Sequence, residues 1–84
     1  LQVIYFYFCK MIDVIKEKIK EIAFKKVNDS DELFKSGILT SILVIDLATA
    51  LEDEFNISIP FNEITLENFS TPELIKKYVD SKIG

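Results

Sequence analysis

The stretch from Gly37 to Phe55, which reads G-I-L-T-S-I-L-V-I-D-L-A-T-A-L-E-D-E-F, constrains the fold more than any other part of the chain. Gly37 can adopt the positive φ of a tight turn, and Thr40 is a favoured helix N-cap, which places Ser41 in the first helical turn. The apolar residues that follow recur at helical spacing. They are Val44, Leu47, Ala48, Leu51 and Phe55. We therefore predict an amphipathic helix that packs against a core.

The opposite side of this predicted helix combines apolar and acidic residues. Ile42, Ile45 and Thr49 also follow helical spacing, and carboxylates surround them. The segment from Ser41 to Phe55 has four carboxylates and no lysine, so it accounts for the formal net charge of −4 of the whole chain. An exposed apolar stripe beside concentrated charge is typical of a docking surface for basic partners. The predicted partner-binding residues are Thr40, Ile42, Ile45, Asp46, Thr49, Glu52 and Asp53.

Composition narrows the class of protein. A chain of 84 residues, 49% of them hydrophobic, is sufficient for one domain with a single small core. Two glycines and two prolines disfavour disorder and an all-β fold. One cysteine, Cys9, cannot form an intrachain disulfide, which fits the cytoplasm. The acidic net charge argues against nucleic acid as a partner.

The residue types also limit the chemistry. There is no histidine, and all ten basic residues are lysines, so the commonest general base and nitrogen metal ligand are missing. No motif places a base beside Ser41, and by spacing alone a serine at a helix start is more often a capping or first-turn residue than a reactive one. A calcium loop beginning at Asp29 is excluded, because Leu33 and Phe34 occupy positions that require an oxygen ligand and glycine. We predict no catalytic residue and no metal site.

The first ten residues, L-Q-V-I-Y-F-Y-F-C-K, differ from the rest of the chain. They show no helical or alternating period, they are far shorter than the roughly 20 residues that span a bilayer, and no positive charge precedes them as in a signal peptide. We predict that residues 1–10 are an extension outside the core and that the domain comprises residues 11–84, beginning at a plausible initiator, Met11.

Helical spacing recurs on both sides of the central stretch. The spacing of Ile12, Ile15, Ile19 and Ile22 predicts a helix to about Lys26, and a long loop from Asn28 to Ser36 follows. Asn56 predicts a helix end, and the Ile57–Pro60 segment predicts an extended loop tethered to the core. Thr71, Pro72 and Glu73 mark the start of a last helix with an apolar face of Ile75, Tyr78 and Val79. The predicted fold is all-α, a small helical bundle.

These features together resemble the acyl carrier protein and peptidyl carrier protein family. The resemblance rests on the L-F-K-S-G-I-L loop, the serine that opens a helix ending in L-E-D-E-F, and the I-S-I-P segment, and it runs from about Ile12 to Ile83. It implies a short additional helix at Phe61 to Leu66, and thus a four-helix bundle of three main helices plus one short helix.

The resemblance also implies a function. In that family a phosphopantetheinyl transferase uses coenzyme A and Mg²⁺ to attach 4′-phosphopantetheine to a serine, here Ser41, and the thiol of the arm carries an acyl or aminoacyl group as a thioester. The chain would then be a monomeric cytoplasmic carrier and not an enzyme. It would work with that transferase, a loading ligase and downstream acyl-processing enzymes that have basic docking surfaces.

Two departures from the family pattern leave alternatives open. The family motif is usually Asp-Ser-Leu, whereas this chain has Thr40-Ser41-Ile42, and Leu43 occupies a position that is acidic in many fatty-acid carriers. The first alternative is a carrier-like interaction module that is never modified and docks through the Ser41–Phe55 helix. The second is an unrelated helical regulatory domain that binds through Ile42 and Ile45. The cargo could be of the fatty-acid, polyketide, D-alanyl or amino-acid type.

Overall fold

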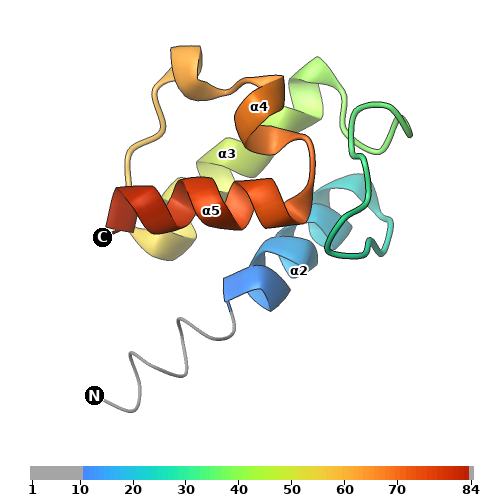
Figure 1. Cartoon of the computed structure of the whole chain (residues 1–84), viewed down its shortest axis with the longest axis horizontal. Helices are drawn as coiled ribbons and strands as arrows, with labels where there is room; N and C mark the ends of the chain where they lie inside the picture. The colour runs from blue at the N-terminus through green and yellow to red at the C-terminus, as the bar shows by residue number, and fades with distance from the viewer. Residues whose placement is uncertain (1–10, 84) are drawn as a thin grey trace.

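The structure is a computed structural model that describes residues 11–83 (Figure 1). Along the chain the elements are α2 (Met11–Ala23), α3 (Ser41–Phe55), the 3₁₀ helix η1 (Phe61–Glu63), α4 (Leu66–Phe69) and α5 (Pro72–Ile83). Residues 11–83 contain no strand, which confirms the predicted all-α class. Residues 1–10, predicted to be an extension outside the core, lie outside the described residues.

Helix α2 is shorter than the spacing of its isoleucines predicted. It ends at Ala23 instead of Lys26, because Phe24 takes a left-handed conformation with φ 57° and its N–H donates to the Lys20 carbonyl at 2.8 Å. This is a helix C-cap in the left-handed form, with phenylalanine at a position that usually holds glycine. The buried face also begins one residue earlier than predicted. Its fully buried residues are Met11, Ile15 and Ile19, and Ile12 and Ile22 are only partly buried.

Helix α3 follows its predicted bounds and faces. Thr40 caps the N-terminus, and Asn56 closes the C-terminus in the left-handed conformation with φ 54°. All five predicted core residues are buried: Val44, Leu47, Ala48, Leu51 and Phe55. Periodicity was sufficient here, because the five-residue apolar stripe contains no charged residue, whereas carboxylates surround Ile42 and Ile45 on the other side of the helix.

The predicted short helix consists of two separate elements. Phe61–Glu63 forms a single 3₁₀ turn, and α4 begins only at Leu66 after Thr65, which has an extended conformation. Ile59 is buried in the core and Ile57 packs against it, as expected for an extended loop tethered to the core. The last helix begins at Pro72 as predicted, with the Thr71 hydroxyl accepting from the Leu74 N–H at 3.2 Å.

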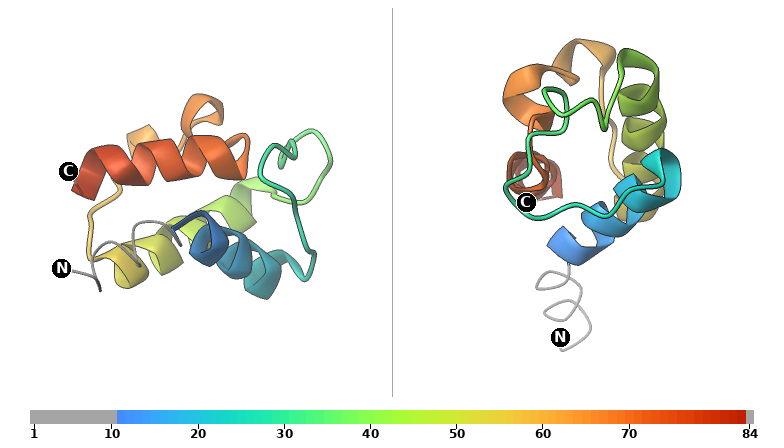
Figure 2. Two further views of the ribbon diagram at one scale, coloured as in Figure 1. Left: turned by 60° about the horizontal axis from the view of Figure 1, so that its bottom comes forward. Right: turned by 90° about the vertical axis from the view of Figure 1, so that its right-hand side faces the viewer.

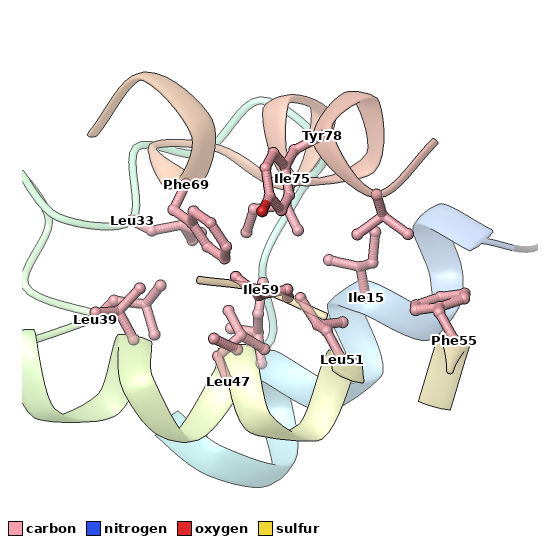
Figure 3. Packing of buried hydrophobic residues seen from close by; sticks show 14 of the residues in the cluster. Ile15, Leu33, Leu39, Leu47, Leu51, Phe55, Ile59, Phe69, Ile75 and Tyr78 are labelled. Carbon is pink, nitrogen blue, oxygen red and sulfur yellow. The ribbon is translucent and has the colours of Figure 1, made fainter. Parts of the chain in front are cut away.

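The core lies between α3 on one side and α4 and α5 on the other, and α2 packs against both α3 and α5 (Figures 1 and 2). Figure 3 shows Leu47 and Leu51 of α3 facing Phe69 of α4 and Ile75 of α5, with Ile59 between the two sets. The long loop between α2 and α3 crosses one end of the molecule, in front of α5 in the right-hand view of Figure 2. This loop determines where α3 begins, and therefore where Ser41 lies.

Candidate functional site

The loop before α3 is fixed to the core at Leu33. This side chain is fully buried, its N–H donates to the Ser70 carbonyl at 2.7 Å, and its own carbonyl accepts from the Leu39 N–H at 2.9 Å. Phe34 is partly buried and packs against the core as well. Gly37 has φ 79°, and a Cβ there would meet no atom within 4 Å, so glycine is favoured by the backbone angle and not by lack of space. The chain therefore enters α3 from an anchored turn.

Ser41 is the first residue of α3, and it is exposed. Thr40 makes the cap: its Oγ1 accepts from the Leu43 N–H at 3.2 Å, and its carbonyl accepts from the Val44 N–H at 2.9 Å. Within residues 11–83 the Ser41 hydroxyl has no hydrogen-bond partner. By contrast, the nearby Ser36 hydroxyl donates to the Glu32 carbonyl at 2.5 Å. Ser41 thus offers an uncommitted hydroxyl to solvent.

The start of α3 suits a covalently bound phosphate. The N–H groups of Ser41 and Ile42 have no intrahelical acceptor, because the first turn of a helix lacks preceding carbonyls. No acidic residue occupies the first turn, so the positive end of the helix dipole faces no carboxylate of α3. A phosphodiester on the Ser41 oxygen would bring its negative charge to this end of the helix, a favourable arrangement.

Most of the predicted partner-binding residues share one exposed face. The Ile42 side chain is 72% exposed and that of Ile45 is 46% exposed, and Thr40, Asp46 and Asp53 are exposed as well. Thr49 is exposed, and its hydroxyl donates to the Ile45 carbonyl at 3.1 Å. We call this surface, Ile42, Ile45, Asp46, Thr49 and Asp53, the α3 face.

Glu52 differs from the other carboxylates of the predicted docking surface. It is half-buried, and its Oε2 accepts from the Ile59 N–H at 2.7 Å. Its neighbour Glu54 lies 3.4 Å from the Lys18 ammonium, measured between Oε1 and Nζ. The carboxylates of α3 therefore differ: Asp46 and Asp53 face solvent, whereas Glu52 and Glu54 contact other parts of the fold.

A second polar cluster, which sequence reasoning missed, joins η1 to α5. Glu63 Oε1 accepts from the Tyr78 hydroxyl at 2.5 Å and lies 2.8 Å from the Lys82 ammonium nitrogen, which sits 5.6 Å from the centre of the Tyr78 ring. The Glu63 carbonyl accepts from the Asn68 side chain at 2.9 Å. The hydrogen bonds from Lys82 and Tyr78 lower the pKa of Glu63, whereas burial and then the Glu63 bond raise the pKa of Tyr78. No spacing motif could have revealed this cluster, because Glu63 and Tyr78 are 15 residues apart on different elements.

Residues 11–83 contain no group of His, Cys, Asp and Glu side chains that could hold a metal ion. None of the helices in the described part of the chain has the length and hydropathy needed to span a membrane.

Comparison with known proteins points to one class of site. A family model described as "Phosphopantetheine attachment site" matches residues 10–79. The chain is 32% identical over 76 residues to a D-alanyl carrier protein of Leuconostoc citreum, an alignment that covers 83% of this chain and 97% of the relative. It is 31% identical over 74 residues to a D-alanyl carrier protein of Bacillus velezensis, with 87% and 94% covered.

Proposed function

This chain belongs to the phosphopantetheine-binding carrier protein family, and from that premise we propose that Ser41 is the residue to which the arm is attached. As a member of the family, the chain carries its cargo as a thioester on a covalently bound 4′-phosphopantetheine. Carrier proteins of this family are generally not catalysts and work with transferases and ligases. The proposal concerns which serine is modified, which cargo is carried and which surface the partners contact.

The observation that supports Ser41 as the attachment site is the geometry at the start of α3. Its hydroxyl is exposed and has no partner within residues 11–83, and it opens a 15-residue helix whose first turn bears no acid. A phosphate attached there lies at the positive end of the helix dipole. The chain supplies no histidine to act as a base, so we assign activation of the serine oxygen to a separate transferase. The oxygen attacks the diphosphate phosphorus of coenzyme A that bears the pantetheine, and adenosine 3′,5′-bisphosphate leaves.

Thr40 occupies the position of the aspartate in the usual motif and can replace it as a helix cap but not as a negative charge. Its hydroxyl accepts the Leu43 N–H and so caps the helix, but it brings no negative charge. We propose that a transferase acting on this chain does not require the carboxylate of the usual motif. If it did, the chain would be the unmodified interaction module that this substitution also permits.

Mass spectrometry tests the attachment site. Incubation of the chain with coenzyme A, Mg²⁺ and a permissive phosphopantetheinyl transferase should add the mass of one phosphopantetheine. Ser41→Ala should abolish the addition and change the free energy of unfolding by less than about 0.5 kcal/mol, because the hydroxyl is exposed and unbonded. Ser36→Ala and Thr40→Ser are the matched controls and should still be modified. Modification mapped to Thr40 or Ser36, or an unchanged wild-type mass with several transferases, would contradict the proposal.

For the cargo we propose a D-alanyl group. This finer assignment is supported by relatives named D-alanyl carrier proteins, which align with this chain over nearly their whole length. The phosphopantetheinylated chain, incubated with ATP, D-alanine and an aminoacyl-loading ligase of such a system, should gain one alanyl mass that hydroxylamine removes, as expected for a thioester. Loading by a fatty-acyl ligase instead, with none from D-alanine, would contradict this assignment.

We also propose that the α3 face is the surface that partner enzymes contact. The exposed Ile42 and Ile45 supply apolar area, and the exposed Asp46 and Asp53 supply negative charge for basic partners. A rim of charge around apolar contacts raises the association rate and selects partners of opposite sign.

A further inference from the structure

Glu52 organises the turn that follows α3 through both its backbone and its side chain. Its carbonyl accepts from the N–H groups of Asn56 and Ile57, the latter at 3.2 Å, and its Oε2 accepts from the Ile59 N–H at 2.7 Å. These bonds turn the chain sharply after Asn56, which has the left-handed conformation, and they set Ile59 into the core. The carboxylate therefore supplies an acceptor for an N–H group that no helix or sheet satisfies.

Residues 57–65, which we call the strap, connect α3 to α4. Glu52 holds its first half, and the bonds of Glu63 to Tyr78 and Lys82 hold its second half against α5. Between these two attachments lies Phe61, whose side chain is 71% exposed. The strap thus presents a large aromatic side chain to solvent while both of its flanks are fixed.

Glu52 also lies on the same helical stripe as two residues of the α3 face. Ile45, Thr49 and Glu52 follow the spacing i, i+4 and i+7, so the carboxylate stands where that face meets the strap. Phe61 is therefore an exposed apolar residue on the segment that Glu52 attaches to α3.

We propose that Glu52 is a positioning residue for partner recognition, which holds the strap so that Phe61 extends the α3 face as a second apolar contact for the phosphopantetheinyl transferase. This inference rests on the proposed function. It assigns the electrostatic part of docking to Asp46 and Asp53, which are exposed, and a structural part to Glu52, whose carboxylate is engaged with Ile59. The partner that fits is an enzyme with a basic rim and an apolar pocket.

The two roles respond differently to charge removal and to salt. If the Glu52 carboxylate acts as a docking charge, Glu52→Gln removes that charge as completely as Glu52→Ala. The effect of the charge then fades when salt screens exposed charges. If the carboxylate instead acts as the acceptor for the Ile59 N–H, Glu52→Ala removes the acceptor, whereas the amide oxygen of Glu52→Gln largely retains it. This role is insensitive to salt. Glu52→Ala and Glu52→Gln therefore separate the roles.

Hydrogen exchange of the free chain tests the attachment without any partner. Glu52→Ala should speed exchange of the Ile59 N–H about tenfold or more, as expected when a charge-assisted hydrogen bond is lost, and Glu52→Gln should speed it much less. Asp53→Ala is the matched control and should leave that exchange rate unchanged. Equal exchange of Ile59 in Glu52→Ala and wild type would overturn the proposal.

Transferase kinetics test the role in recognition. At high salt, Glu52→Ala should raise the KM for the chain about tenfold with kcat unchanged, as when binding area is lost, and Glu52→Gln should restore the wild-type value. Phe61→Ala should raise KM to the same extent while leaving Ile59 exchange unchanged. If Glu52→Gln is as impaired as Glu52→Ala and salt removes both defects, Glu52 is a docking charge and the proposal is wrong. If the proposed function fails, the mass-spectrometry experiment shows this separately, because the wild-type chain then stays unmodified.

Discussion

Phe24 is a residue whose conformation and exposure both oppose stability. Its φ of 57° places a residue with a Cβ in the strained left-handed region. Its side chain is 90% exposed, so burial of the ring contributes little stability. The strain persists because the N–H of Phe24 closes the last turn of α2 on Lys20.

We predict that Phe24→Gly stabilises the domain by about 0.5–1 kcal/mol. Relief of left-handed strain is worth about 1–2 kcal/mol and is partly offset by the greater flexibility of glycine in the unfolded chain. Phe24→Ala, which removes the aromatic ring but retains a Cβ, should give no such gain. Urea unfolding measures the free energy of unfolding of both variants. Equal values for Phe24→Gly and Phe24→Ala would rule out backbone strain at this position.

Glu63 should make stability depend on pH in the acidic range. Its pKa is lowered from the ordinary value of 4.5, first by the hydrogen bond from Lys82 and then by that from Tyr78. A carboxyl whose pKa falls on folding stabilises the folded state above its unfolded pKa, and this contribution is lost as pH falls through the lowered folded value. Glu63→Gln should therefore be less stable than wild type at pH 7, and the difference should shrink to nothing at pH values below the folded pKa.

Tyr78→Phe is the companion variant for this test. It removes the hydroxyl donor and leaves Lys82 in place, so the pKa of Glu63 should rise partway toward 4.5. An NMR titration of the Glu63 carboxyl measures the rise. An identical titration curve in wild type and Tyr78→Phe would show that the hydroxyl does not stabilise the carboxylate.

At the scale of elements, α3 combines two faces with different functions. Its buried face fills the core through residues such as Leu47 and Leu51, whereas its exposed face bears Ile42 and Ile45 beside carboxylates. Because the two faces are separate, a change on the exposed face should alter association without altering folding.

We predict that Asp46→Lys/Asp53→Lys slows association with the transferase by about tenfold or more at low ionic strength. The reason is that charge steering contributes most when the Debye length is long, and it should fade toward physiological salt. The melting temperature should stay close to that of wild type, since both side chains are exposed. Glu17→Lys/Glu73→Lys makes the same change in net charge on α2 and α5 and serves as the control. If the control slows association equally, net charge and not the α3 face governs the rate.

At the scale of the whole molecule, the domain is closed by contacts between distant parts of the chain. Met11 at the start of α2 is 1% exposed, and the Leu33 N–H donates to Ser70, which brings the loop before α3 against the segment before α5. The core is thus assembled from residues that span almost the entire described range.

We predict that a chain beginning at Met11 retains helicity and cooperative melting. The described core already includes the first turn of α2, and residues 1–10 lack its amphipathic pattern. The melting temperature should change by less than about 4–8 °C, which corresponds to about 1 kcal/mol for a domain of this size. Circular dichroism measures both properties, and sedimentation reports the oligomeric state. Loss of cooperative melting would show that residues 1–10 contribute to the core or to an oligomer.

Features that depend on local periodicity and local backbone chemistry could be predicted from the sequence. The buried and exposed faces of α3, the Thr40 cap, the left-handed Asn56 and the start of α5 at Pro72 all follow from residues within a few positions of one another. Features that depend on distant partners came from tertiary packing. It turned Glu52 toward Ile59, joined Glu63 to Tyr78 and Lys82, and divided the predicted short helix into η1 and α4. A carboxylate on a helix has the same local sequence signature whether it faces solvent or an unpaired N–H, and only packing brings that N–H within reach.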